Sequence, residues 1–329
     1  MTNIAPHMTA YLRQRLPVER AASQHTCDTY AYAFQLLLDF ASSKLAVTPS
    51  ALQLEHLDAP FVLEFLEHLQ NTRGNAPRTR NARLTAIKSF MHFVEHRVPG
   101  ALEQIGRVLA IPYQKTDRPL VDHLSAEQCK AVLDRPEPTT RLGIRDRAML
   151  HLSVTAGLRV SELVGLCLDD VAFESRYLNL HVRGKGRKNR LLTLWKAVAE
   201  SVRAWLAVRG EAMVPELFLN AQGKHMTRAG FEYVLLKHAA AASECCPSLR
   251  AKRLSPHVLR HTCALTILQA TGDIRKVALW LGHESIQTTE DYLRVDVTQR
   301  IAVLGAVTPP PLRPGKFRPP DQLIASLRG

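Results

Sequence analysis

Residues 255–261, Ser-Pro-His-Val-Leu-Arg-His, give the firmest indication of both local structure and chemistry in this chain of 329 residues. Serine followed by proline is typical of a helix start, with serine at the N-cap and proline in the first helical position. His257 and Arg260 then lie three residues apart, in the first turn and on one face of the helix. Because a helix N-terminus favours an anion, the stretch predicts an anion-binding helix end.

Two further elements follow toward the C-terminus. Residues 273–281 are expected to form a helix that Gly282 ends, which places His283 just beyond a helix end. Tyr292 lies nine residues after His283, on another helix expected to start near Ser285. A histidine therefore follows Arg260 after 23 residues, and a tyrosine follows that histidine after nine.

Two elements lie upstream of this stretch. Arg159 and Glu162 are three residues apart on a predicted helix, so Glu162 is placed to orient the guanidinium group. Residues 177–182 alternate apolar and polar, as does the stretch after Arg190, which indicates a β-hairpin. Lys185 is flanked by two glycines between these strands, so we expect it at the tip of the hairpin.

Together these elements supply the groups needed for a phenol to attack a phosphodiester without a metal ion. Arginine presents a planar, permanently charged fork to the phosphate, which gains negative charge in its transition state. A tyrosine, with an ordinary pKa of about 10, needs a proton acceptor, and histidine supplies one. The departing oxygen needs a proton, for which lysine is the donor. The predicted catalytic residues are Arg159, Lys185, His257, Arg260, His283 and Tyr292.

At these six positions the chain resembles the tyrosine recombinases, also called the phage integrase family, and in particular their Xer-like bacterial members. The resemblance covers roughly residues 23–300 and rests on TAGLRVSEL at 155–163, RGKGRKNR at 183–190, SPHVLRH at 255–261 and LGHESIQTTEDY at 281–292. The chain departs from the family in a proline-rich tail and in a slightly long segment between Arg159 and Lys185.

The resemblance implies a site-specific DNA recombinase. Family members cut one strand through the tyrosine, leaving a 3′-phosphotyrosyl link and a free 5′ hydroxyl that attacks the partner duplex. The implied partner is double-stranded DNA with paired half-sites, bound by a homo- or hetero-tetramer, and accessory recombinases are left open. No cofactor and no metal are implied. The biological role is open among integration, excision or transposition of a mobile element and dimer resolution.

The expected fold is mainly α, with an N-terminal helical DNA-binding domain of the SAM-like kind and an α-rich catalytic domain that holds a small antiparallel β-sheet. The expected boundaries are 1–110 for the first domain, 111–122 for a linker, 123–305 for the catalytic domain and 306–329 for the proline-rich tail. Helical periodicity begins at Thr26 and recurs at 60–70 and 78–96, whereas residues 1–22 are expected to be an irregular lead-in.

A net charge of +13 fits a polyanionic partner, although a membrane or ribosome surface would also attract it. The candidate DNA contacts are basic residues on the third N-terminal helix and on the hairpin, and a solvated charged face is the alternative for each. These candidates are Arg80, Arg83, Lys88, Arg187, Lys188 and Arg190. The six cysteines show no C-x-x-C spacing, and no signal peptide or long apolar span is evident, so we expect a cytoplasmic protein with no membrane contact.

Three other functions compete with this interpretation. A relaxing topoisomerase uses similar chemistry, but the N-terminal helical domain disfavours it. A DNA-binding accessory protein of a recombination complex, with its chemistry unused, is the main alternative, and the six intact residues argue against it. A metal-dependent transposase is disfavoured because no constellation of two aspartates and a glutamate is needed to explain any motif.

Overall fold

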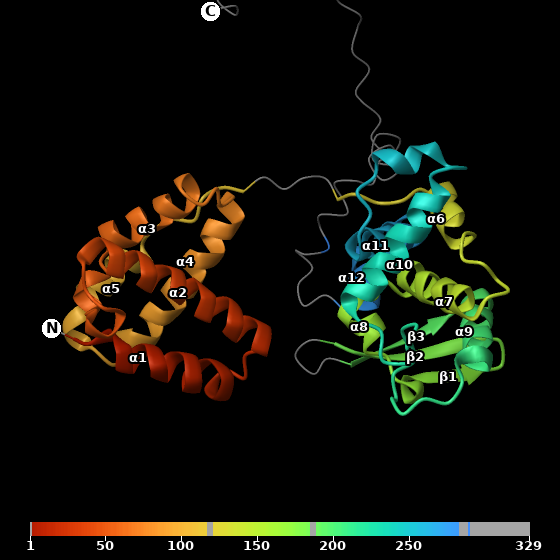
Figure 1. Cartoon of the computed structure of the whole chain (residues 1–329), viewed down its shortest axis with the longest axis horizontal. Coiled ribbons are helices and arrows are strands. Elements are labelled where there is room, and N and C mark those ends of the chain that lie inside the picture. The colour runs from red at the N-terminus through yellow and green to blue at the C-terminus, as the bar shows by residue number, and fades with distance from the viewer. Residues whose placement is uncertain (1, 117–120, 185–188, 283–288, 290–329) are drawn as a thin grey trace, which may run out of the picture. The chain divides into compact units, whose positions relative to one another are not determined.

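The computed structural model describes residues 2–116, 121–184, 189–282 and 289 (Figure 1). The chain divides into two compact units, Met1–Arg118 and Pro119–Gly329. Both are built mainly from helices, and the second also holds one small antiparallel sheet. The prediction of a mainly α fold with a small antiparallel sheet is confirmed.

The first unit is mainly helical in its described part. Its elements are α1 (Ile4–Ala10), the π-helix η1 (Tyr11–Glu19), α2 (Gln24–Leu45), α3 (Ala59–Asn71), α4 (Pro77–Glu95) and α5 (Leu102–Leu109), with short 3-10 turns η2 (Pro49–Ala51), η3 (Leu54–His56) and η4 (Pro99–Ala101). The helices α2, α3 and α4 correspond to the three that the periodicity predicts. Their apolar faces meet in one core, in which Tyr11, Phe34 and Phe90 pack ring against ring.

The expectation of an irregular lead-in over residues 1–22 is wrong, because α1 and η1 occupy most of it. Ile4, Met8 and Tyr11 recur at intervals of four and three residues, and all three side chains are buried. The hydroxyl of Tyr11 donates a hydrogen bond of 2.7 Å to Ser89 on α4. Two prolines and several charged residues hide this apolar stripe in the sequence, although its spacing is helical.

Part of the segment expected as a linker belongs to the first unit. Ile111 is buried in its core, and Arg80 donates a hydrogen bond of 3.0 Å to the carbonyl oxygen of Pro112. Asn81 donates to the carbonyl oxygen of Gln114 at 2.8 Å. Residues 111–114 are therefore fixed to α4.

The described part of the second unit contains a small sheet and seven helices. They are α6 (Ala126–Leu133), α7 (Arg141–Ala156), α8 (Val160–Val164), α9 (Lys196–Arg209), α10 (Arg228–Ala242), α11 (Pro256–Thr271) and α12 (Ile274–Leu281), with 3-10 turns η5 (Leu168–Asp170) and η7 (Pro247–Ala251). The sheet has the order β1-β2-β3, with β1 at Val171–Glu174, β2 at Tyr177–Arg183 and β3 at Asn189–Leu194. No helix of the described residues is long and apolar enough to cross a membrane.

The register of the hairpin decides which of its side chains face the core. In β2 the buried residues are Leu178, Leu180 and Val182, which face the helices of the unit. Val182 is the direct partner of Arg190 across the antiparallel pair. Because opposed residues in a sheet point to the same face, Arg190 lies on the inward face of β3.

Gly157 fixes the junction between α7 and α8 and offers a test of this packing. Its φ is +59°, and an added Cβ would lie 2.5 Å from Cδ2 of Leu281 and 3.0 Å from Sγ of Cys263. Gly272 ends α11 with a φ of +63°, but a Cβ there meets nothing within 4 Å. We expect Gly272→Ala to cost about 1 kcal/mol of unfolding free energy, the backbone penalty alone. Gly157→Ala should cost at least about 2 kcal/mol more because of overpacking, and equal losses in denaturant unfolding would contradict this.

Candidate active site

The N-terminal turn of α11 carries His257 and Arg260, as predicted. Ser255 occupies the N-cap position and Pro256 the first helical position, although the serine side chain makes no capping hydrogen bond. His257 is exposed, whereas Arg260 is buried. The helix therefore holds one group at the surface and one inside, one turn apart.

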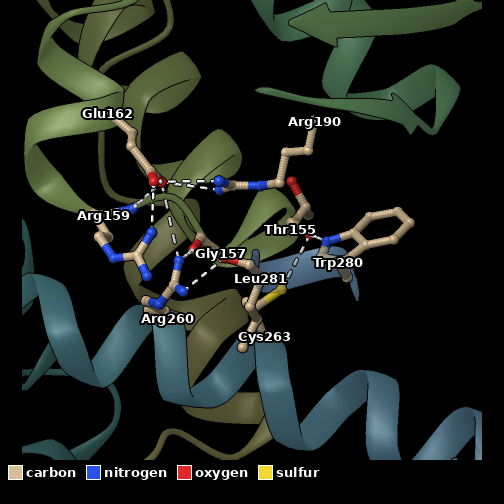
Figure 2. Close-up of polar contacts among 9 residues, drawn as sticks. All are labelled: Thr155, Gly157, Arg159, Glu162, Arg190, Arg260, Cys263, Trp280 and Leu281. Atoms are coloured by element: carbon tan, nitrogen blue, oxygen red, sulfur yellow. Dashed lines mark hydrogen bonds and ion pairs between the residues drawn. The ribbon is translucent and has the colours of Figure 1, made fainter. Parts of the chain in front are cut away.

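Two backbone carbonyl groups hold the guanidinium of Arg260 in place (Figure 2). Its Nη1 donates to the oxygen of Gly157, and its Nη2 donates to the oxygen of Leu281 at 2.8 Å. Gly157 follows α7 and Leu281 is the last residue of α12. Arg260 thus joins the ends of two helices, and its hydrogen bonds fix its position.

The carboxylate of Glu162 gathers the other charged groups of the site (Figure 2). Arg159, the N-cap of α8, donates to it from its backbone N–H at 2.8 Å and from Nη1 at 2.7 Å. Arg190 donates to it from Nη1 at 3.2 Å and from Nη2 at 2.9 Å. Nη1 of Arg260 lies 4.0 Å away. The expectation that Glu162 orients Arg159 is confirmed.

This cluster is ionised and carries excess positive charge. Burial alone would raise the pKa of Glu162, but the hydrogen bonds and charge of Arg190, followed by those of Arg159, lower it overall. Three guanidinium groups around one carboxylate leave a net charge of +2. Arg159 is the most accessible of them, with 37% of its side chain exposed. The cluster can therefore receive an anion at Arg159.

His261, the neighbour of Arg260, is not a cationic member of this group. Burial, followed by the nearby charges of His257 and Arg260, lowers its pKa to about 4. Its ring lies 6.3 Å from that of His257. At neutral pH the histidine is therefore uncharged and adds no positive charge to the cluster.

Several predicted residues lie outside the described part of the chain. They are Lys185, Arg187, Lys188, His283 and Tyr292, together with the tail 306–329. The described residues beside them agree with the expected local structure. Arg183 pairs with Asn189 at the end of the hairpin, and Gly282 ends α12 in the left-handed region. Among the described residues, no group of three or more side chains is placed to hold a metal ion.

Two of the candidate DNA contacts do not face solvent. Arg80 is only 5% exposed, because its guanidinium turns inward to the carbonyl oxygen of Pro112. Arg190 is bound to Glu162, on the inward face of β3. Both corrections have one cause, which is that a basic residue with a buried acceptor in reach pairs with it.

Arg83 and Lys88 are half-buried on α4 and contact aromatic rings. The guanidinium of Arg83 lies 4.9 Å from the ring centre of Tyr32, and Nζ of Lys88 lies 4.7 Å from that of Tyr113. Lys88 also lines a cavity of about 430 Å³ with Arg15 and Arg20, which the sequence reasoning missed. Arg15 lies on η1 and Arg20 directly follows it, in the stretch that the sequence predicted to be irregular.

The comparisons with known proteins agree with this arrangement. Residues 122–299 match the model of the "Phage integrase family", and residues 9–98 match "Phage integrase, N-terminal SAM-like domain". A protein of Sinorhizobium fredii that carries the name integrase/recombinase y4rC is 41% identical over 99% of this chain and 98% of its own length. Tyrosine recombinase XerC of Myxococcus xanthus is 32% identical over 94% of this chain and 99% of its own.

Solved structures show the same fold. The XerH site-specific recombinase bound to palindromic difH substrate, in a post-cleavage complex, matches with a TM-score of 0.68 and 22% identity over 88% of this chain and 81% of that one. The Tn1549 transposon integrase with transposon right end DNA matches with a TM-score of 0.66 and 16% identity over 92% of this chain and 100% of that one. The chain belongs to the phage integrase family and is a Xer-like tyrosine recombinase, an enzyme of site-specific recombination that cleaves and rejoins DNA through a tyrosine intermediate.

Proposed function

We propose that this recombinase cleaves double-stranded DNA at paired half-sites with Tyr292 as the nucleophile. The observation that carries the proposal is the cluster in which Arg159 and Arg260 lie beside Glu162, because it brings two charged donors together where a phosphate can bind. The chain reaches Tyr292 ten residues after Gly282, which ends the helix α12 beside Arg260.

The two arginines have separate tasks in this proposal. Arg159 is accessible and donates to a non-bridging oxygen of the scissile phosphate. Arg260 is buried and held by two carbonyl groups, so it supplies fixed positive charge. A preorganised donor of this kind is worth about 100- to 1000-fold in rate.

Proton transfer falls to the remaining groups. His257, exposed at the first turn of α11, and His283 accept the phenolic proton or donate to the phosphate. Lys185 protonates the departing 5′ oxygen. The covalent bond between Tyr292 and the 3′ phosphate conserves the energy of the phosphodiester. A free 5′ hydroxyl can therefore attack this bond, release the tyrosine and rejoin the strand without consuming a nucleotide cofactor.

The first unit serves as a DNA-binding domain in this proposal, with Arg83 and Lys88 as backbone contacts and Arg15 and Arg20 beside them. Hairpin residues Arg187 and Lys188 are proposed as further contacts. The XerH complex contains a palindromic substrate, which is in line with paired half-sites and a tetramer on DNA for this chain. We place its action in the cytoplasm.

Substitution of the proposed nucleophile gives the first test. We expect Tyr292→Phe to bind DNA with wild-type affinity and to form no covalent adduct, because the phenol oxygen is the attacking atom. The probe is the duplex most enriched by the full chain from a random-sequence pool, nicked beside the cleavage position to trap the adduct. An adduct at wild-type yield would exclude Tyr292, and no adduct from the wild type would favour the accessory protein.

The general acid is tested through its leaving group. Lys185→Ala should slow cleavage of ordinary DNA by about 100-fold or more, since the 5′ oxygen then departs unprotonated. A bridging 5′-phosphorothiolate leaves without a proton, so the variant should cleave it at close to the wild-type rate. Single-turnover rates on both substrates decide the matter, and an equal defect on both would leave Lys185 with a positioning role only.

Binding by the first unit is tested at Lys88. Lys88→Ala should weaken binding to duplex DNA of any sequence and lower the slope of log Kd against log salt by about 1, the signature of one lost phosphate contact. Arg107→Ala on α5 is the control, because Arg107 is exposed, pairs with Glu103 and does not line the cavity. Titrations over a range of salt measure both, and equal slopes would remove Lys88 from the interface.

A further inference from the structure

Arg190 belongs to the hairpin, yet its side chain leaves the sheet to meet α8. It is the second residue of β3, opposite Val182 on the inward face. Only 11% of its side chain is exposed, and both terminal nitrogens donate to the two oxygens of Glu162. This two-pronged geometry fixes the plane of the carboxylate, which a single point charge cannot do.

The same side chain also lies against the end of α12. A Cβ added to Gly282 would be 3.0 Å from Nη1 of Arg190 and 3.3 Å from its Cδ. Arg190 therefore lies against Gly282, which precedes His283 in the chain, while its own strand begins four residues after Lys185. Through Glu162 it reaches Arg159 as well. Arg190 thus connects β3, the end of α12 and the carboxylate of Glu162.

We propose that Arg190 is a positioning residue for the reaction. It binds Glu162, so that the positive charges of Arg159 and Arg260 remain available to the phosphate. The inference rests on the proposed function of those two arginines. With Arg190 in place, the carboxylate is neutralised by a group that does not itself face an open surface. Without it, Glu162 pairs with the two phosphate-binding arginines alone, and the net charge of the cluster falls from +2 to +1.

The geometry indicates how the site changes when Arg190 is absent. Nη1 of Arg260 already lies 4.0 Å from Glu162, so loss of the competing donor draws the two groups together. That movement takes Arg260 away from the carbonyl oxygens of Gly157 and Leu281 that hold it. The expected defect is therefore in transition-state charge neutralisation, with DNA binding little changed.

A substrate with a neutral reacting group separates this role from a general structural one. A methylphosphonate at the scissile position has a methyl group in place of one non-bridging oxygen, so less charge develops for the arginines to neutralise. We expect Arg190→Gln to slow adduct formation on phosphate DNA by about 10- to 100-fold, the range expected when charge stabilisation is weakened. On the methylphosphonate duplex the same variant should lose less than about 3-fold, which is small beside the effect of one lost donor.

The measurement is the single-turnover rate of covalent complex formation by the full chain, at saturating protein, on the selected duplex with either group at the mapped cleavage position. Arg190→Lys keeps one charge and loses the fork, so its rate on phosphate DNA should lie between those of the wild type and Arg190→Gln. It also serves if Arg190→Gln does not fold. Arg183→Ala is the matched control, because Arg183 lies on the same hairpin and also pairs with a carboxylate, that of Asp170 on η5 at 3.0 Å, but is 70% exposed. It should retain the wild-type rate on both substrates.

Two results would overturn the inference. Equal losses on phosphate and methylphosphonate show that Arg190 only supports the fold, and a wild-type rate on phosphate shows that it has no part in the reaction. Failure of the proposed function gives a different result, because the wild type would then form no adduct that depends on Tyr292. That result would contradict both the proposed function and the role of Arg190.

Discussion

The carboxylate of Glu162 is the point at which the second unit's separate segments meet. It is 5% exposed and accepts hydrogen bonds from α8 and β3, with the guanidinium of α11 close by. A buried carboxylate without partners would be costly, and it would take up a proton instead of staying charged. The surrounding arginines remove that cost and, in turn, are held in place by it. Any arrangement of α8, the hairpin and α11 that separates these groups leaves a buried charge unpaired, so the cluster restricts how the segments can pack.

A buried cluster of charged groups contributes little net free energy to folding, which suggests that it has another role. Replacing a buried ion pair by apolar residues of similar size is often neutral or even stabilising. The Nε atom of Arg190 is also buried without a hydrogen-bond partner among the described residues, which costs about 1–3 kcal/mol. These costs fit the proposed function, in which the site presents fixed positive charge, because preorganised dipoles and charges need not rearrange during the reaction.

Sequence patterns predicted most of the elements and part of the site. The spacing of Arg159 and Glu162 predicts their contact, and the serine and proline before His257 predict the start of α11 correctly. The direction of the Arg190 side chain is a feature that the sequence patterns did not predict. Its place in a basic hairpin suggested DNA, whereas the register opposite Val182 turns it inward. Register depends on pairing between strands, and composition does not report it. Arg80 was misjudged for a related reason, because the acceptor that buries it comes from Pro112, which lies 32 residues away in the chain.

The two kinds of basic residue in this chain respond differently to their surroundings. Arg83 and Lys88 contact exposed aromatic rings at the surface, where salt screens charge over a Debye length of about 8–10 Å. The guanidinium groups of Arg190 and Arg260 beside Glu162 are largely removed from solvent, so screening weakens them much less. In the proposed function, salt that loosens the hold of the first unit on DNA therefore leaves the charges of Arg190 and Arg260 nearly intact. In the proposed function, affinity for DNA and neutralisation of the scissile phosphate are thus carried by different arginines and lysines, so a substitution in one set need not disturb the other.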